Sequence, residues 1–189
     1  MNEIIPTPEV DVLIATCLWL HSHKWKILQI SVSIQVGRRY NIDVEHVKQK
    51  LSEAGVPTKD KDVRFVQRGT DIIAQKGVIT FKIECKGLGK GATGTLMDHF
   101  RRAFTSSVCY FNGSKNLQIG MAMPLNKTYL NLISKIPKAL IEVTNMWNLI
   151  YNPESERICP LSPEKLCELP DDNRAKAIQA YVMKLTRCS

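Results

Sequence analysis

Asp71, Glu84 and Lys86 are the residues whose types and spacing could perform chemistry in this chain. They fall in two segments, 63–74 and 78–86, which are rich in β-branched residues and are predicted to be the strands of a hairpin. Because side chains alternate along a strand, Glu84 and Lys86 point to the same face of the second strand. The partner strand decides whether Asp71 faces them.

The predicted turn at Lys76–Gly77 sets the register of this hairpin. In that register Asp71 lies opposite Lys82, with Glu84 as its diagonal neighbour at roughly 7 Å between backbones. A four-residue turn would keep the same facing, whereas a three-residue turn would reverse it. We therefore expect Asp71 and Glu84 to converge from adjacent strands, with Lys86 next along the chain.

Two converging carboxylates repel each other unless a positive charge lies between them. Mg²⁺ takes oxygen ligands, commonly one or two carboxylates and several waters, and would polarise a phosphoryl oxygen held beside Asp71 and Glu84. The amino group of Lys86 could position or deprotonate the attacking water. This set of groups suits phosphodiester hydrolysis. The alternative is that Thr80, Lys82, Glu84 and Lys86 form the solvated face of an ordinary antiparallel strand.

The spacing of Asp71 and the Glu84-Cys85-Lys86 run resembles the D-(x)n-E-x-K signature of the PD-(D/E)xK nuclease superfamily, with Thr70 in place of the proline. The order of predicted elements is also similar to that family. A helix over 41–54 precedes the hairpin, and a helix over 96–111 and a strand over 117–123 follow it. The resemblance covers roughly residues 41–151 and could extend to the first helix.

The resemblance implies a restriction-endonuclease-like fold with an αβββαβ core, and Mg²⁺-dependent cleavage of DNA, with Mn²⁺ as a substitute metal. Asp71 and Glu84 would be the metal ligands, helped by the backbone carbonyl of Cys85, and Lys86 would be the catalytic lysine. Some members bring a glutamate from the first helix to the site, for which Glu9 and Glu45 are the candidates. Such folds often act as homodimers.

The charge of the chain favours a polyanionic partner. Lys and Arg number 26 against 18 Asp and Glu, a formal net charge of +8, and nucleic acid is the commonest intracellular polyanion. The candidates for DNA contacts are the basic residues near the predicted site: Lys82, Lys90, Arg101 and Arg102. Lys90 lies in a glycine-rich loop, Gly87–Gly94, whose N–H groups could hold a phosphate, although Gly91 after Lys90 breaks the P-loop pattern. Exposed salt bridges are the alternative for the two arginines.

The remaining segments complete an α/β (α+β) fold with a mixed sheet flanked by helices. Five further elements are predicted: a first helix capped by Thr7 with Pro8 in its first turn, a strand or bent pair over 25–36, a helix over 127–145 broken near Pro137, a last strand over 147–151, and a helix over 172–185. We expect one nuclease-like domain over 1–153 and a C-terminal appendage over 154–189.

The apolar-rich stretch at 12–20 is too short for a membrane span of about 20 residues, and the start of the sequence does not resemble a secretory signal. We therefore expect a cytoplasmic protein that does not enter the membrane. Two other functions compete with the nuclease. One is a nucleic-acid-binding or assembly module that keeps the fold without catalysis, and the other is a small-molecule enzyme that holds a nucleotide on the glycine-rich loop.

Overall fold

The computed structural model describes residues 6–32, 40–59, 61–89 and 93–187. Within these ranges the helices are α1 (Glu9–Ser22), α2 (Tyr40–Glu53), α3 (Thr93–Cys109), α4 (Lys127–Ile133), α5 (Lys138–Thr144), α6 (Pro163–Glu168) and α7 (Arg174–Arg187). The strands are β1 (Lys26–Ser31), β2 (Arg64–Val66), β3 (Ile72–Lys76), β4 (Ile79–Cys85), β5 (Leu117–Pro124), β6 (Met146–Asn152) and β7 (Arg157–Leu161). Lys90 and the predicted strand beyond residue 32 lie outside the described residues.

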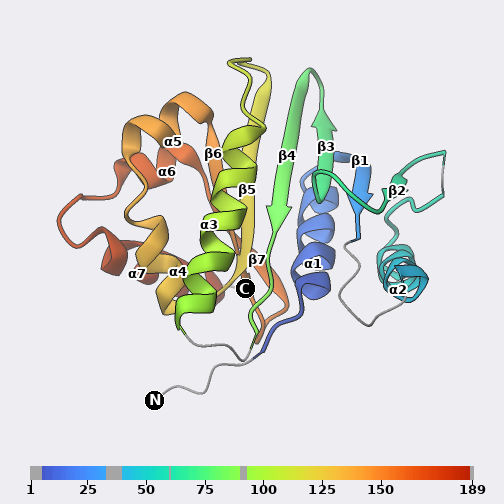
Figure 1. Ribbon diagram of the computed structural model, residues 1–189, viewed down its shortest axis with the longest axis horizontal. Coiled ribbons are helices and arrows are strands. Elements are labelled where there is room, and N and C mark those ends of the chain that lie inside the picture. The colour runs from blue at the N-terminus through green and yellow to red at the C-terminus, as the bar shows by residue number, and fades with distance from the viewer. Residues whose placement is uncertain (1–5, 33–39, 60, 90–92, 188–189) are drawn as a thin grey trace.

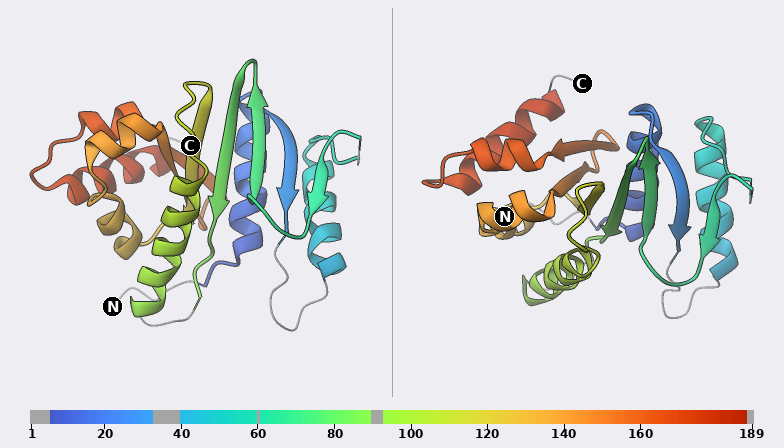
Figure 2. Two further views of the ribbon diagram at one scale, coloured as in Figure 1. Left: turned by 45° about the horizontal axis from the view of Figure 1, so that its top comes forward. Right: turned by 90° about the horizontal axis from the view of Figure 1, so that it is seen from above.

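The seven strands of the described chain form one mixed sheet in the order β2-β1-β3-β4-β5-β6-β7 (Figure 1). The pairs β1–β3, β3–β4 and β6–β7 are antiparallel, whereas β1–β2, β4–β5 and β5–β6 are parallel. Helices lie on both sides of the sheet, as the two views in Figure 2 show. The predicted α/β (α+β) class with a mixed sheet between helices is confirmed.

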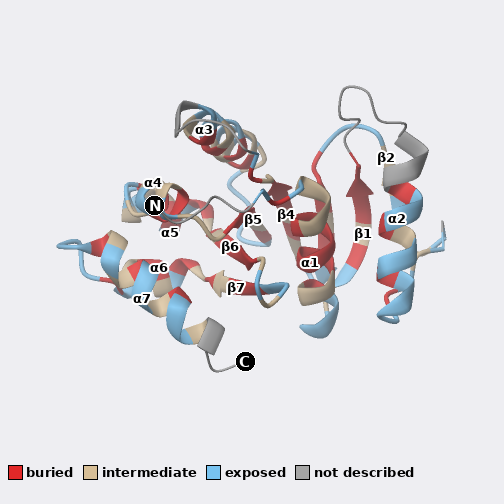
Figure 3. Ribbon diagram, turned by 90° about the horizontal axis from the view of Figure 1, so that it is seen from below, coloured by how far each residue is buried: buried red, intermediate tan, exposed pale blue. Residues whose placement is uncertain are grey.

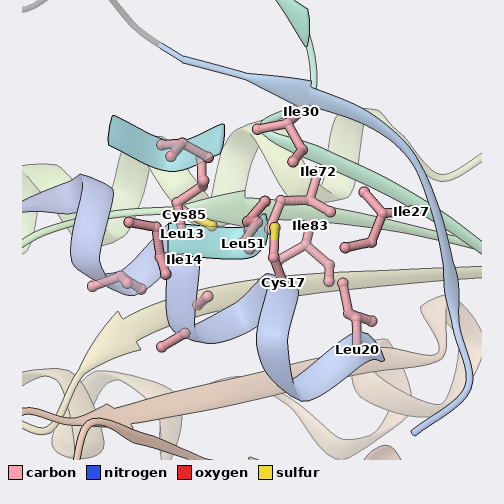
Figure 4. Close-up of a cluster of buried hydrophobic side chains, with 14 of the residues drawn as sticks. Leu13, Ile14, Cys17, Leu20, Ile27, Ile30, Leu51, Ile72, Ile83 and Cys85 are labelled. Carbon is pink, nitrogen blue, oxygen red and sulfur yellow. The ribbon is translucent and has the colours of Figure 1, made fainter. Parts of the chain in front are cut away.

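Apolar side chains bury both faces of this sheet. On one face α1 packs across the strands, and Figure 4 shows its Leu13, Cys17 and Leu20 directed at Ile72 and Ile83. On the other face α3 to α7 cover β5, β6 and β7. Figure 3 shows the buried residues concentrated in the strands and on the inner sides of the helices. In the described ranges no helix has the length and apolar character that crossing a membrane requires.

The start of α1 differs from the sequence prediction. Pro8, not Thr7, occupies the N-cap position, and no side chain caps the helix there. The backbone of Thr7 is instead paired with Leu88 in an antiparallel bridge, with N···O distances of 2.8 and 2.7 Å. This bridge fastens the first turn of α1 to the segment that leaves β4.

The prediction of a single strand over 63–74 is wrong. The structure divides it into β2 and β3, which lie on opposite sides of β1. The chain crosses from one side to the other through residues 67–71, where Gly69 has a φ of +116° that other residues rarely adopt. In the sequence, the local sign of this crossing is the polar run 67–71, which contains Gly69.

The hairpin of β3 and β4 forms as predicted, but its register is different. Lys76 pairs with Ile79, so the turn is Gly77–Val78, and Gly77 supplies a φ of +59°. Lys82 therefore lies opposite Ile73 and not opposite Asp71. The shift is two residues, which preserves the facing of every side chain.

The C-terminal residues are not an appendage, and β6 is not the last strand. β7 pairs with β6 and forms one edge of the sheet. Ile178 and Val182 of α7 are fully buried in the second apolar cluster. The guanidinium of Arg174, also buried, donates to backbone carbonyls of Ile136 and Leu166 at 2.8 and 3.1 Å. These contacts integrate 154–187 into the same core.

The other predicted elements are close to their expected bounds. α2 ends before Gly55, whose φ of +75° stops the helix. Pro137 separates α4 from α5, as its missing N–H predicts. α3 begins at Thr93, and the hydroxyl of Ser107 donates to the carbonyl of Gly120 at 3.0 Å, which anchors the helix to β5.

Candidate active site

Asp71 and Glu84 meet where β3 begins and β4 ends. Ile72 pairs with Ile83, and continuing this register places Asp71 opposite Glu84. Both acids are nearly buried, with 4% and 8% of their surfaces exposed. The backbone N–H of Cys85 donates to Oδ2 of Asp71 at 2.7 Å, which fixes this carboxylate against the end of β4. The convergence predicted for the two acids is therefore present.

The ammonium of Lys86 lies among these acidic groups. Its Nζ is 3.0 Å from Oε1 of Glu84 and 3.8 Å from Oδ2 of Asp71, and it donates to the carbonyl of Cys85 at 2.7 Å. The backbone of Lys86 is bonded to Ala122 of β5, so the side chain starts from an ordered position. The three residues singled out by the sequence form one cluster.

Glu9 brings a third carboxylate from the first turn of α1. Its Oε2 lies 3.6 Å from Nζ of Lys86. A methyl group on Gly87 would lie 2.6 Å from the carbonyl of Thr7 and from the N atom of Glu9, so only glycine permits this close approach of α1. The other helical candidate, Glu45, lies 3.7 Å from Lys48 on the exposed side of α2 and does not join the cluster.

Two tyrosines contact the cluster from the side of the sheet opposite α1. The hydroxyl of Tyr110, just after α3, donates to Oε2 of Glu84 at 2.8 Å. The hydroxyl of Tyr129 in α4 donates to the carbonyl of Gly87 at 3.3 Å. The sequence analysis did not identify either residue, because their contacts depend on how α3 and α4 pack on the sheet.

Burial and mutual repulsion determine the protonation of these acids. Burial raises the pKa of Asp71 to about 7; Lys86 opposes that rise and the charge of Glu84 adds to it. Burial also raises the pKa of Glu9, against the attraction of Lys86. Burial by itself lowers the pKa of Lys86, but the charges of Asp71, Glu9 and Glu84 raise it well above its usual range. Lys86 is therefore an ammonium at neutral pH.

The ionised cluster has three negative charges and one positive charge in a largely buried place. Such an excess is costly unless a cation or a proton compensates it. The carboxylates of Asp71 and Glu84 and the carbonyl of Cys85 are oxygen donors of the kind that Mg²⁺ prefers. In the part of the chain that the structure describes, no three His, Cys, Asp or Glu side chains make up a metal-binding group. Mg²⁺ in proteins is commonly held by one or two carboxylates, with water as the remaining ligands.

The residues predicted to contact DNA are not all near this cluster. Lys82 is half-buried on the same face of β4 as Glu84, with its Nζ 5.7 Å from the centre of the Tyr110 ring. Arg101 and Arg102 are exposed on α3, and Nε of Arg102 lies 2.9 Å from Oδ2 of Asp98. The structure therefore places Lys82 beside the site and pairs Arg102 within its own helix.

Comparisons with protein-family models, curated proteins and solved structures gave no match to this chain. The fold and the site define it as a mixed α/β protein in which three carboxylates surround a lysine at the edge of a β-hairpin. Its activity has to be inferred from that geometry.

Proposed function

We propose that the protein is a metal-dependent deoxyribonuclease that hydrolyses phosphodiester bonds, with Asp71 and Glu84 as ligands of Mg²⁺. The elements α1, β1, β3, β4, α3 and β5 support this proposal, because three antiparallel strands that are adjacent in the sheet, followed by a helix and a parallel strand, resemble the αβββαβ core of the PD-(D/E)xK superfamily. In this alignment α1 takes the place of the first helix, and α2 with β2 is an insertion.

The observation that carries the proposal is the buried, net-negative cluster around Lys86. Structural ion pairs normally balance charge, whereas among the residues that the structure describes this site holds Glu9, Asp71 and Glu84 against a single ammonium. Carboxylates with raised pKa values in one partly buried place are typical of functional sites. A divalent cation would restore the balance of charge.

Bound Mg²⁺ would supply a Lewis acid that stabilises negative charge on the phosphate oxygens. The chain's own groups position the reactants. Lys86 stays protonated, so it acts by donating hydrogen bonds to the attacking water or to the phosphate, and not as a base. Glu9 is left outside the proposed ligand set, and the raised pKa of its carboxylate suits it to accept the proton of that water.

The charge of the chain supports DNA as the substrate. The excess of eight positive charges would give affinity for the phosphate backbone that falls with rising salt. Among the described basic residues that were predicted to contact DNA, Lys82 shares a face of β4 with Glu84 and would contact the strand that enters the site.

Cleavage of plasmid and of single-stranded DNA with Mg²⁺, with Mn²⁺ and with EDTA tests the proposal. We expect the wild-type protein to cleave with either metal. We expect Glu84→Gln to lower the cleavage rate at least a hundredfold, because glutamine has nearly the size of glutamate but not its negative charge. The matched control is Glu45→Gln, which changes an exposed glutamate of α2 and should cleave as wild type does. Circular dichroism confirms that each variant is folded.

The proposal of a nuclease would be contradicted if the wild-type protein cleaves with neither Mg²⁺ nor Mn²⁺, or if Glu84→Gln and the wild type cleave at equal rates. If that protein still binds DNA, the result favours a nucleic-acid-binding module that retains the fold.

A further inference from the structure

A second candidate site lies at the opposite end of α1. A pocket of about 340 Å³ opens between the end of that helix, the start of β1 and the connection from α2 to β2. Glu9 begins α1 and His21, in the wall of the pocket, follows twelve residues later, which corresponds to roughly 18 Å of helix. The pocket is therefore separate from the acidic cluster.

The wall of the pocket offers an aromatic surface. Trp25 lines it together with Val56 and Val63, which are both buried. The indole packs against the ring of Phe81, with centroids 5.4 Å apart, so the core holds it in place. A half-buried tryptophan fixed in this way is a surface on which a flat aromatic group can stack.

The rim of the pocket is mainly basic. Lys24 and Lys26 line it with exposed side chains, and His21 lies beside them. Asp62 contributes one carboxylate, which can accept hydrogen bonds from amino or hydroxyl groups. A ligand that complements these groups has an aromatic part, an anionic part and a hydrogen-bond donor.

The backbone at Lys24 is a further sign of a role for its side chain. Lys24 has a φ of +65° directly after α1, where the N–H of Trp25 bonds to the carbonyl of Leu20 at 2.9 Å. This is the position in a helix C-cap that glycine normally occupies, because a side chain there is strained. Residues held in such conformations cluster at ligand-binding and active sites, and Lys24 lines the pocket.

We propose that this pocket binds one nucleotide, with the base stacked on Trp25, the phosphate held by Lys24 and Lys26, and an amino or sugar hydroxyl group donating to Asp62. The volume lies at the low end of the range of about 300–1,000 Å³ found for small-molecule sites, which suits a single nucleotide. The same chemistry could come from a free nucleotide or from one residue of a nucleic-acid strand. The proposal does not depend on the nuclease activity.

Titration with 5′-AMP, followed by calorimetry and by tryptophan fluorescence, tests the proposal on the full chain. We expect AMP to bind and to quench fluorescence, and we expect Lys24→Gly to weaken binding at least tenfold. Glycine is the residue that this φ favours, so the variant should melt at the wild-type temperature or above it. Lys176→Ala, which removes an exposed lysine from α7, is the matched control and should bind AMP as wild type does. Trp25→Phe keeps an aromatic ring against Phe81 and should lose most of the quenching.

Two further probes identify the source of the nucleotide. The first is a single-stranded decanucleotide. If it binds while AMP does not, and if Lys24→Gly weakens its binding, the ligand is one residue of a nucleic-acid strand. Inorganic phosphate that binds as tightly as AMP would overturn the role of Trp25. Absence of binding by AMP and by the oligonucleotide, or binding that Lys24→Gly leaves unchanged, would overturn the proposal.

Discussion

Replacing Asp71 with asparagine is expected to stabilise the metal-free protein above neutral pH. The carboxylate is buried, and burial raises its pKa from the ordinary 3.8 to about 7. Asparagine has nearly the same size, and its amide oxygen can still accept the bond from the N–H of Cys85. The substitution therefore removes a costly charge and keeps the local hydrogen bond.

The size of the effect follows from linkage between protonation and folding. A carboxyl whose pKa is higher in the folded than in the unfolded protein destabilises the folded state when it is ionised. The free energy of unfolding of the wild type therefore falls as the pH rises from 3.8 to 7 and is level above that. At about 1.4 kcal/mol per pH unit the loss from Asp71 is at most about 4 kcal/mol. Asp71→Asn lacks this loss and should be the more stable protein at pH 8, while the two should be similar at pH 4.

Thermal unfolding in EDTA between pH 4 and 8.5 measures this difference. For a chain of this length each kcal/mol corresponds to about 2–4 °C in melting temperature. Mg²⁺ should then raise the melting temperature of the wild type at pH 8 and leave that of Asp71→Asn nearly unchanged, because a ligand that binds only the folded state stabilises it.

Asp172→Asn is the matched control, since this aspartate is exposed just before α7 and its replacement should alter neither the pH dependence nor the response to Mg²⁺. A variant Asp71→Asn that is less stable than wild type at pH 8 in EDTA would refute the reasoning. It would mean that the ionised Asp71 contributes more through its attraction to Lys86 than its burial costs.

Two other changes test the supports of the site. Tyr110→Phe removes the hydroxyl that donates to Glu84. The free energy of unfolding, measured with a chemical denaturant, should fall by about 1.5–3 kcal/mol, which is typical of a hydrogen bond to a charged group. An unchanged free energy of unfolding would show that water replaces the contact. Gly87→Ala places a methyl group against the backbone of Thr7 and Glu9, and should cost about 1–3 kcal/mol in the same assay. Retention of full stability by Gly87→Ala would mean that α1 can move away without loss.

The sequence predicted the chemistry of the site better than its geometry. Alternation along β4 placed Glu84 and Lys86 on one face, and the turn signal placed Asp71 on the same face. The turn itself was assigned one residue early, because Lys76 and Gly77 are both plausible in a tight turn. The predicted side-chain directions are correct, because a register shift of two residues preserves them. The predicted pairing of Asp71 with Lys82 is wrong.

Other errors come from contacts between distant segments. The polar run 67–71 with Gly69 marks an interruption between β2 and β3, but that the two strands pair with opposite sides of β1 is a tertiary property. The proline-rich and charged composition after residue 153 led to the prediction of an appendage. In the structure, β7 pairs with β6 and belongs to the sheet. Tyr110 could not be assigned to Glu84 from its position in the sequence, because the approach of α3 to β4 is a tertiary property.

The bridge between Thr7 and Leu88 has a consequence for the order of folding. The hairpin can form by itself from neighbouring residues, but Glu9 reaches Lys86 only after a loop of almost eighty residues has closed. A truncated chain that begins after α1 would keep Asp71, Glu84 and Lys86 and lose the third carboxylate together with the helix that covers their strands. The three negative charges are thus assembled around the ammonium of Lys86 only when the chain from Glu9 to Lys86 has closed on itself.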